Sequence, residues 1–404
     1  MDASLPTPTA GAETAWVAEH LADLVIGPIA ASPSIRGGQT AADRAVEAFD
    51  VTGYANRRNE VYPRSRRGAS GLSPYIRYGL VSLPHMWKAV AVGPHADVAK
   101  FRDELLWQEY ARHLYARTDG ASTSLRHYVP ERTTAPAADW VGEMACLKLV
   151  LDELTDDGWL VNQTRMWFAS HWSVRMGLGW RDGEDLFFTH LLDGSRAANR
   201  LGWQWTVGAG TGRPYGFAHG QVEKRAPGVC GGCPLRQQCP IQSYPAESDL
   251  PSVDPVAGLR SDPSPEATAG PSVTQVFSTP DAVWLTAESL GDDDPALAAH
   301  PELPAVFIFD EALLARLHLS AKRLIFIAEC LADLAERREV QVWRGDPTSV
   351  LASANIATTF APVPGWKRRS AIIAPVEIHP WPWLVRPQGG SATSFTAWRK
   401  SSGR

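Results

Sequence analysis

The spacing of apolar residues changes along this chain on either side of a proline-rich segment. Between about residues 14 and 215 apolar residues recur at helical intervals, as in Phe101, Leu105 and Tyr110. Residues 241–275 are dominated by Pro, Ser, Asp, Ala and Gly, a mixture that buries too little apolar surface to order itself. This change predicts a helical part, a flexible linker and a third part of another class.

Short apolar runs follow the linker: AVWLT at 282–286, AVFIF at 305–309 and VQVW at 340–343. Residues 310–338 have the spacing of a helix. Strands that alternate with helices predict a parallel sheet with crossover helices. We therefore predict an α + α/β protein, with an all-helical domain over residues 1–240, a flexible linker over 241–275 and a Rossmann-like parallel α/β domain over 276–404.

The composition is that of an ordinary soluble protein, with 44% hydrophobic and 21% charged residues in 404. No apolar run of about 18 residues and no signal-like start is present, so we expect a cytoplasmic protein without a membrane segment. Most of the 16 tryptophans precede residue 210, which suits core packing, an aromatic cofactor or an electron-transfer chain.

The net charge of −5 argues weakly against a polyanionic partner. Five arginines nevertheless fall between residues 57 and 67, against Glu60 alone. This cluster predicts either a phosphate-binding surface or a solvated basic face.

Four segments of the first half resemble the photolyase/cryptochrome family. The first runs from Tyr54 through Arg58-Asn59 and continues at Ser70-Gly-Leu72-Ser73-Pro-Tyr. It is similar to the segment that holds the FAD phosphates in that family, which implies that Tyr54, Ser70, Leu72 and Ser73 bind the cofactor. A serine before proline is also an ordinary helix cap.

The second segment is Glu104-Leu-Leu-Trp107-Gln-Glu-Tyr-Ala-Arg-His-Leu, which is similar to a hallmark helix of the family. Glu104 and Trp107 are three residues apart and share one helix face. The resemblance implies that both contact an extruded base pair. An amphipathic helix with a buried tryptophan would have the same spacing.

The third segment, from Gly158 to Met166, resembles the part of the family that runs over the flavin and the lesion pocket. It implies that Asn162 and Met166 line the pocket and that Arg165 pairs with Asp193 beside the flavin. By the same resemblance Arg58 and Gln163, the latter in place of the family's arginine, contact DNA.

The fourth segment is Asp193-Gly-Ser195-Arg-Ala-Ala-Asn199, followed by Trp203-Gln-Trp205. The resemblance implies that Asp193, Ser195 and Asn199 bind the flavin ring. It also assigns the tryptophans: Trp203 as first electron donor, Trp180 as second, Trp140 as a candidate third, and Trp205 in the lesion pocket opposite Trp107.

Three cysteines, Cys230, Cys233 and Cys239, are close together in the sequence. Such a compact set favours metal binding over a disulfide. Its resemblance to the bacterial iron–sulfur photolyases implies that Cys146 is the fourth ligand of a [4Fe-4S] cluster. Four thiolates also suit zinc, and an unmetallated set remains open.

The part after the linker, from Trp284 to Leu297 and onward, resembles the photolyase antenna domain, which usually comes first in the family. The resemblance therefore implies a reversed, circularly permuted domain order. An antenna chromophore and a purely structural role stay equally open for this domain.

The implied function is repair of cyclobutane pyrimidine dimers in damaged DNA, driven by blue light through electron transfer from reduced FAD. The alternative is a cryptochrome-like flavin photoreceptor that signals to a protein partner without repair. A flavin and iron–sulfur protein with an altered activity is the third reading.

Overall fold

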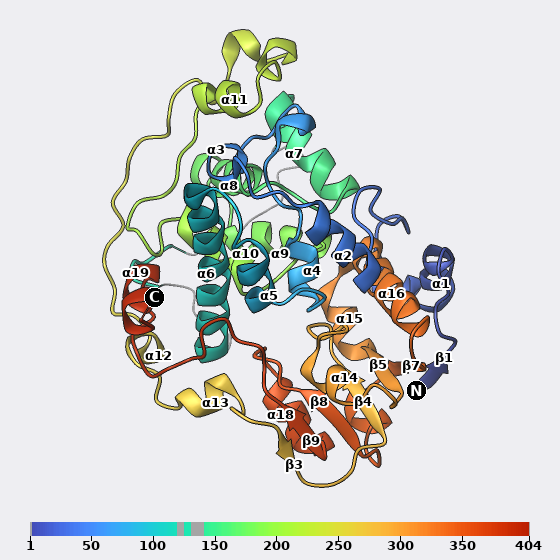
Figure 1. Cartoon of the computed structure of the whole chain (residues 1–404). Helices are drawn as coiled ribbons and strands as arrows, with labels where there is room; N and C mark the ends of the chain where they lie inside the picture. Colours follow the sequence, from blue (N-terminus) through green and yellow to red (C-terminus); the bar gives the residue numbers. More distant parts are fainter. Residues whose placement is uncertain (1, 119–124, 131–140, 404) are drawn as a thin grey trace.

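A computed structural model describes residues 2–118, 125–130 and 141–403 of the chain. In Figure 1 most helices of residues 39–225 gather on one side, and the sheet with its own helices forms the other. The helices of residues 39–225 are α2 (Gln39–Ala48), α3 (Tyr54–Arg57), α4 (Ser73–Arg77), α5 (Leu83–Ala89), α6 (His95–Thr118), α7 (Ala145–Asp156), α8 (Asn162–Ser170), α9 (Trp180–His190), α10 (Ala198–Thr206) and α11 (His219–Arg225). Single helical turns lie at Ala22–Leu24, Arg64–Arg66, His171–Arg175, Cys230–Gly232 and Arg236–Gln238.

The sheet has the strand order β1-β7-β5-β4-β8-β9-β3. Its centre is parallel, as the sequence predicts, and is built from β4 (Ala282–Leu285), β5 (Ala305–Asp310), β7 (Val340–Gly345), β8 (Ile356–Thr359) and β9 (Glu377–His379). Residues 305–309 of β5 are all buried, which is typical of a strand covered on both faces. The helices of this part are α14 (Pro295–Ala299), α15 (Glu311–Leu317), α16 (Ala321–Ala335), α17 (Pro347–Val350) and α18 (Trp366–Ile373). The last helix, α19 (Phe395–Ser401), packs on α6 of the helical part (Figure 1).

The N-terminal residues join the sheet. β1 (Ala3–Leu5) pairs antiparallel with β7, with Leu5 opposite Val342. α1 (Glu13–His20) packs against α16, and β2 (Val25–Ile26) pairs with β6 (Leu319–Ser320). Residues 1–26 were expected with the helices. A three-residue strand whose partner lies at the other end of the chain leaves no periodic signal in the sequence.

The prediction of a single helix over residues 310–338 is wrong. The chain forms α15, the short strand β6 and α16, because His318 adopts a left-handed conformation, φ 49°, that ends α15.

Segment 241–275, predicted as a linker, contains α12 (Ala257–Arg260), α13 (Pro265–Ala269) and the edge strand β3 (Gln275–Val276). Leu259 and Ala269 are buried, and Asp262 pairs with Arg117 of α6. The mean composition of the segment does not reveal these few anchoring side chains.

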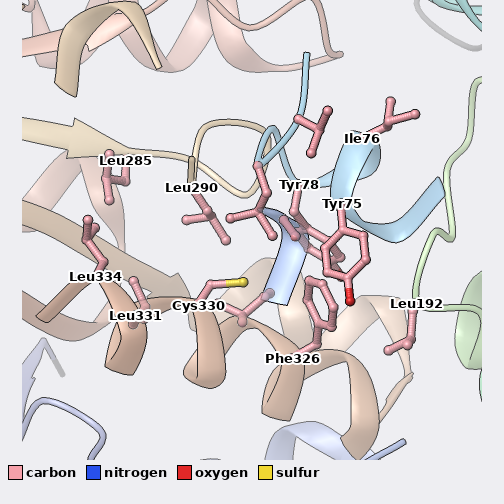
Figure 2. Close-up of a cluster of buried hydrophobic side chains, with 14 of the residues drawn as sticks. Tyr75, Ile76, Tyr78, Leu192, Leu285, Leu290, Phe326, Cys330, Leu331 and Leu334 are labelled. Atoms are coloured by element: carbon pink, nitrogen blue, oxygen red, sulfur yellow. The ribbon is translucent and has the colours of Figure 1, made fainter. Parts of the chain in front are cut away.

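One hydrophobic core joins the helical part to the α/β part (Figure 2). The rings of Tyr78, after α4, and Phe326 of α16 lie 4.9 Å apart between centroids. From the same helix Arg323 donates a hydrogen bond of 3.0 Å to the carbonyl of Gly194. The loop between α9 and α10 is therefore held by α16 of the α/β part.

Among the described residues, no helix has the length and apolarity that crossing a bilayer requires.

Candidate active site

Arg165 of α8 is the centre of a polar group between α8 and α10. Its guanidinium donates to Asp193 Oδ2 at 2.7 Å, to Asn199 Oδ1 at 3.0 Å and to the carbonyl of Leu160 at 3.0 Å. The Arg165–Asp193 ion pair that the sequence predicts is therefore present, and its side chains are 16% and 7% exposed. Ser195 lies in the same loop, where its hydroxyl accepts from the Ala197 N–H at 3.0 Å.

This polar group has unused hydrogen-bonding capacity. Within the described part of the chain, Asp193 Oδ1 and Asn199 Nδ2 are buried and have no hydrogen-bond partner. Buried polar groups are nearly always paired, since an unpaired one costs about 1–3 kcal/mol. A free acceptor and a free donor, on two residues that both bind Arg165, are what a polar ligand edge would satisfy.

Residues 70–77, which include Ser70 and Ser73, lie near the Arg165 group. Trp159, which precedes α8, donates to Ser73 Oγ at 3.0 Å, and Ser70 Oγ accepts from the Leu72 N–H at 3.4 Å. Arg77 of α4 donates to the carbonyl of Gly194 at 3.2 Å. These bonds bring the first and third segments of the resemblance together beside Asp193.

Tyr54 lies in an apolar setting. Its ring packs edge-on against Phe101 at 5.0 Å between centroids, and burial raises the pKa of its hydroxyl. The serine expected to cap α4 does not do so: Ser73 is the first residue of the helix and makes no capping bond to its backbone.

Trp203 of α10 is surrounded by aromatic rings. It is 1% exposed and lies edge-on to Phe187 at 5.2 Å and to Phe168 at 6.1 Å. Its indole also lies over Gly183 of α9, where a built Cβ would come within 2.2 Å of Cη2. Trp180 is three residues before Gly183 on the same helix, so Trp180 and the glycine that Trp203 packs against lie on one face of α9. Trp140 lies outside the described residues.

A second cluster joins the start of α8 to the end of α10. The ring of Trp205, 38% exposed, lies 5.3 Å from that of Tyr215, whose hydroxyl accepts from Gln163 Nε2 at 3.2 Å. Met166 Sδ accepts a weak hydrogen bond from Thr206 at 3.7 Å. Asn162 is the exposed first residue of α8, one turn before Met166. The resemblance did not point to Tyr215.

Glu104 and Trp107 of α6 already have partners within the chain. Arg58 Nε donates to Glu104 Oε1 at 3.1 Å, and Lys100 pairs with the same oxygen at 3.0 Å. Phe395 of α19 stacks on Trp107 with centroids 4.0 Å apart and planes 12° apart. The stacking by Phe395 could not be foreseen from α6 alone.

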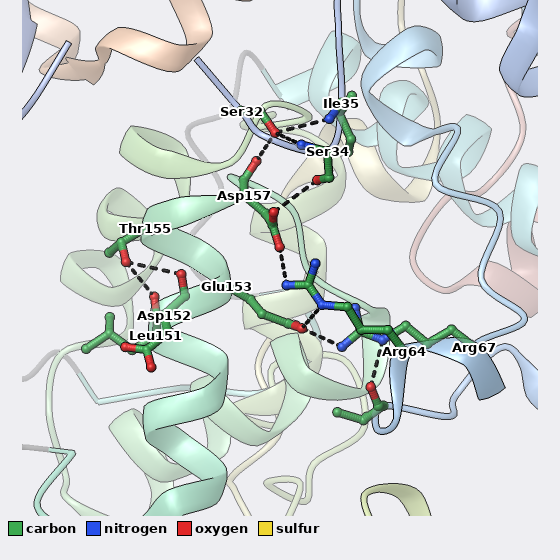
Figure 3. A network of polar contacts seen from close by, with 11 residues as sticks. Ser32, Ser34, Ile35, Arg64, Arg67, Leu151, Asp152, Glu153, Thr155 and Asp157 are labelled. Atoms are coloured by element: carbon green, nitrogen blue, oxygen red, sulfur yellow. Dashed lines mark hydrogen bonds and ion pairs between the residues drawn. The ribbon is translucent and has the colours of Figure 1, made fainter. Parts of the chain in front are cut away.

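The arginine cluster is largely paired with carboxylates (Figure 3). Arg64 and Arg67 bind Glu153 of α7, and Arg64 also binds Asp157. Arg66 binds Glu60 at 2.9 Å. The pairs made by Arg64 and Arg67 hold residues 60–67 against α7. Because these arginines are already paired, the cluster is less suited to bind phosphate than the sequence alone suggests.

The four cysteines expected to bind metal line one small cavity. They are Cys146 from α7 and Cys230, Cys233 and Cys239 from the turns after α11, and all four are free thiols. Burial, followed by the charges of Cys233 and Cys239, raises the pKa of Cys146 to about 12. His219 also lines the cavity and lies with Glu223 and Cys230 in a group whose ligand atoms are within 4.8 Å of one another, which the cysteine spacing does not indicate.

Comparison with known proteins connects this geometry to a family. Residues 101–219 match the FAD binding domain of DNA photolyase. They include most of α6 and all of α7, α8, α9 and α10, and with them the Arg165 group and the tryptophans discussed above. The match supports the photolyase/cryptochrome family for the helical part.

Curated relatives agree with that match. The chain is 31% identical over 195 residues to the deoxyribodipyrimidine photo-lyase of a Synechococcus species, which covers 44% of this chain and 40% of the relative. It is 28% identical over 232 residues to the enzyme of the same name from Vibrio cholerae, covering 52% of this chain and 47% of the relative. The chain thus spans less than half the length of these relatives.

Among solved structures, a bacterial class III photolyase from Agrobacterium tumefaciens is similar at 24% identity and a TM-score of 0.38, covering 43% of this chain and 39% of that one. A Synechocystis cryptochrome is similar at 18% identity and a TM-score of 0.41, covering 50% and 46%.

Proposed function

We propose that this chain repairs cyclobutane pyrimidine dimers in DNA with blue light and FAD. The observation that carries the proposal is the buried Arg165–Asp193–Asn199 group, with its unpaired Asp193 Oδ1 and Asn199 Nδ2, inside the residues that match the photolyase FAD binding domain. The relatives named deoxyribodipyrimidine photo-lyase supply the reaction class.

The residues fit a flavin. The edge of an isoalloxazine ring carries an N–H donor and several acceptors, which match a free carboxylate oxygen and a free amide nitrogen. The hydroxyls of Ser70 and of Ser73, the latter bonded to Trp159, are suited to the phosphates of FAD. Leu72 and Tyr54 are buried and would form the apolar wall. Ser195 uses its hydroxyl inside its own turn and would hold the loop in shape.

When bound, the flavin supplies the light-driven electron, and the protein supplies position and electrostatics. Arg165 holds Asp193 and Asn199 in fixed orientations, and its charge balances that of the carboxylate. Trp203 and Trp180, both buried, would carry electrons toward the flavin.

The lesion would bind between the α6 residues Glu104 and Trp107 and the exposed ring of Trp205. A flipped base gains about 1–3 kcal/mol from stacking on one aromatic ring. Asn162 and Met166 would line the same pocket, while Arg58 and Gln163 would contact the DNA strand.

A flavin photoreceptor without repair is the second candidate. It is favoured by the contacts of the two residues expected to meet the lesion. Glu104 is paired with Arg58 and Lys100, and one face of Trp107 is covered by Phe395. Such a protein would signal to a partner, and damaged DNA would not bind more tightly than undamaged DNA.

Binding in the dark separates the two candidates. The full chain would be titrated with an oligonucleotide that carries one thymine dimer and with its undamaged counterpart. Repair predicts tighter binding of the damaged strand, weakened about 5- to 150-fold in Trp205→Ala, which corresponds to a loss of about 1–3 kcal/mol. Tyr244→Ala, at an aromatic residue that is 60% exposed and outside the site, is the control. Equal affinity for both strands would favour the photoreceptor.

We also propose that Cys146, Cys230, Cys233 and Cys239 hold a [4Fe-4S] cluster. Tetrahedral zinc, with bonds of about 2.3 Å, requires sulfur atoms about 3.8 Å apart. The described residues contain two groups of three ligand atoms within 4.8 Å of one another, and neither includes more than one cysteine. This wider spacing around one cavity suits the larger cluster.

The order of the parts supports a circularly permuted photolyase. The helices that match the FAD binding domain come first, and the parallel sheet follows. We propose that this sheet is the antenna-type domain and assign it no chromophore.

A further inference from the structure

A second group of potential metal ligands lies in the α/β part, apart from the cysteine cavity. It consists of His300, which directly follows α14, and of Glu377 and His379 in β9. One ligand atom from each lies within 4.8 Å of the other two. Glu377 and His379 are two residues apart in a strand and so face the same side of the sheet. Because α14 packs against β8 and β9, it brings His300 to that side.

The three side chains converge on one oxygen atom. Glu377 Oε1 lies 2.8 Å from His300 Nε2 and 2.5 Å from His379 Nε2. The Glu377 and His379 side chains are 8% and 7% exposed, whereas that of His300 is 22% exposed and gives access from solvent.

A fourth residue orients one of the rings. Thr274 Oγ1 lies 3.3 Å from His379 Nδ1, the ring nitrogen that does not face Glu377. Metal-binding histidines usually have such a partner on their other nitrogen, which fixes the ring and its tautomer. Thr274 directly precedes β3, so this contact comes from the segment that joins the two parts of the chain.

We propose that His300, Glu377 and His379 bind one divalent transition metal ion, with zinc as the matching class, through two imidazole nitrogens and one carboxylate oxygen. Two histidines and a glutamate are a known zinc ligand set that leaves a fourth position to water. Bonds of about 2.0–2.2 Å in tetrahedral geometry separate ligand atoms by about 3.3 Å, so these atoms need to move apart by less than about 1 Å. The ion would link β9 to the end of α14. This site is independent of the proposed light-driven function.

Cobalt(II) is the probe for this site, because its visible absorption reports coordination and thiolate ligands add a distinct near-ultraviolet band. The full chain would be titrated with Co²⁺ in the wild type, in His300→Ala and in His85→Ala, which removes a half-exposed histidine outside the group. The cysteines are the same in all three, so differences between the proteins isolate the histidine site. We expect one Co²⁺ per chain, bound without thiolate absorption and displaced by Zn²⁺, in the wild type and His85→Ala, and its loss in His300→Ala.

Two further measurements show whether a loss of Co²⁺ binding comes from the missing ligand or from a change in folding. His300→Ala should keep the circular dichroism spectrum of the wild type, since His300 is partly exposed and follows the helix. Thr274→Val, which leaves all three ligands in place, should weaken binding about 10- to 100-fold. Equal Co²⁺ stoichiometry and affinity in the wild type and a folded His300→Ala would overturn the proposal.

Discussion

Phe395 lies flat on Trp107, with ring centroids 4.0 Å apart, and so joins the C-terminal helix to the predicted lesion-contacting residue. The contact is one of several along α6. Trp398 donates to His113 Nδ1 at 2.9 Å, and Tyr110 donates to the carbonyl of Ala392 at 3.0 Å. Residues 392–398 thereby pack along α6, which lies beside α19 in Figure 1.

The stacked pair should have a measurable coupling energy. In a double-mutant cycle of Phe395→Leu and Trp107→Leu, which retains most of the apolar area, we expect about 0.5–1.5 kcal/mol of coupling in the free energy of unfolding. Urea denaturation of the four proteins measures it. Additive effects would mean that the two rings do not stack in solution.

Gly183 should be intolerant of a side chain. A Cβ at this position would lie 2.2 Å from the indole of Trp203, so Gly183→Ala should displace the ring and cost about 1–3 kcal/mol of stability. Light-induced reduction of bound flavin should slow in parallel. Gly220→Ala in α11, where a Cβ meets no atom within 4 Å, is the control and should be neutral or stabilising by up to about 1 kcal/mol. Unchanged photoreduction in Gly183→Ala would exclude Trp203 from the electron route.

Glu109 should make the fold less stable as the pH rises. Burial raises the pKa of this carboxyl to about 7, from 4.5, while its Oε1 accepts from the Val385 N–H at 2.8 Å. The unfolded chain loses its proton first as the pH rises above 4.5, so stability falls until the folded pKa is passed, by roughly 3 kcal/mol.

Glu109→Gln keeps the accepting oxygen and removes the titration. Chemical unfolding at pH 5 and pH 8 should therefore show a steeper loss of stability in the wild type than in the variant. Parallel pH profiles for the two proteins would contradict a buried, neutral Glu109.

The cysteine cavity should hold iron and inorganic sulfide. Protein purified without oxygen should contain about four of each per chain and show broad absorption near 400 nm, and Cys146→Ser should lose most of both. Cys330→Ser is the matched control, because Cys330 is a buried thiol of α16 outside the cavity. Stoichiometric zinc without iron would refute the cluster.

Local pattern predicted much of the framework. The apolar runs at 282–286, 305–309 and 340–343 form neighbouring parallel strands, because a buried strand leaves a continuous apolar run. The Arg165–Asp193 pair followed from the resemblance, and the four cysteines do line one cavity.

Contacts set by docking could not be predicted in this way. β1 pairs with a strand more than 330 residues away, and Phe395 reaches Trp107 from the far end of the chain. His300 and Glu377 meet only because α14 lies across β8 and β9. None of these contacts is visible as a period or a motif in the sequence, because each one depends on how whole helices and strands pack in the folded chain.

Light-driven repair by this chain would restore separate thymines in damaged DNA, and these can be counted. The purified chain with bound, reduced flavin would be incubated under blue light with an oligonucleotide that carries one thymine dimer, with a dark sample beside it. We predict restoration in the light alone and a strong loss of it in Glu104→Ala. Flavin that is photoreduced while the dimers stay intact in the wild type would contradict repair by this chain.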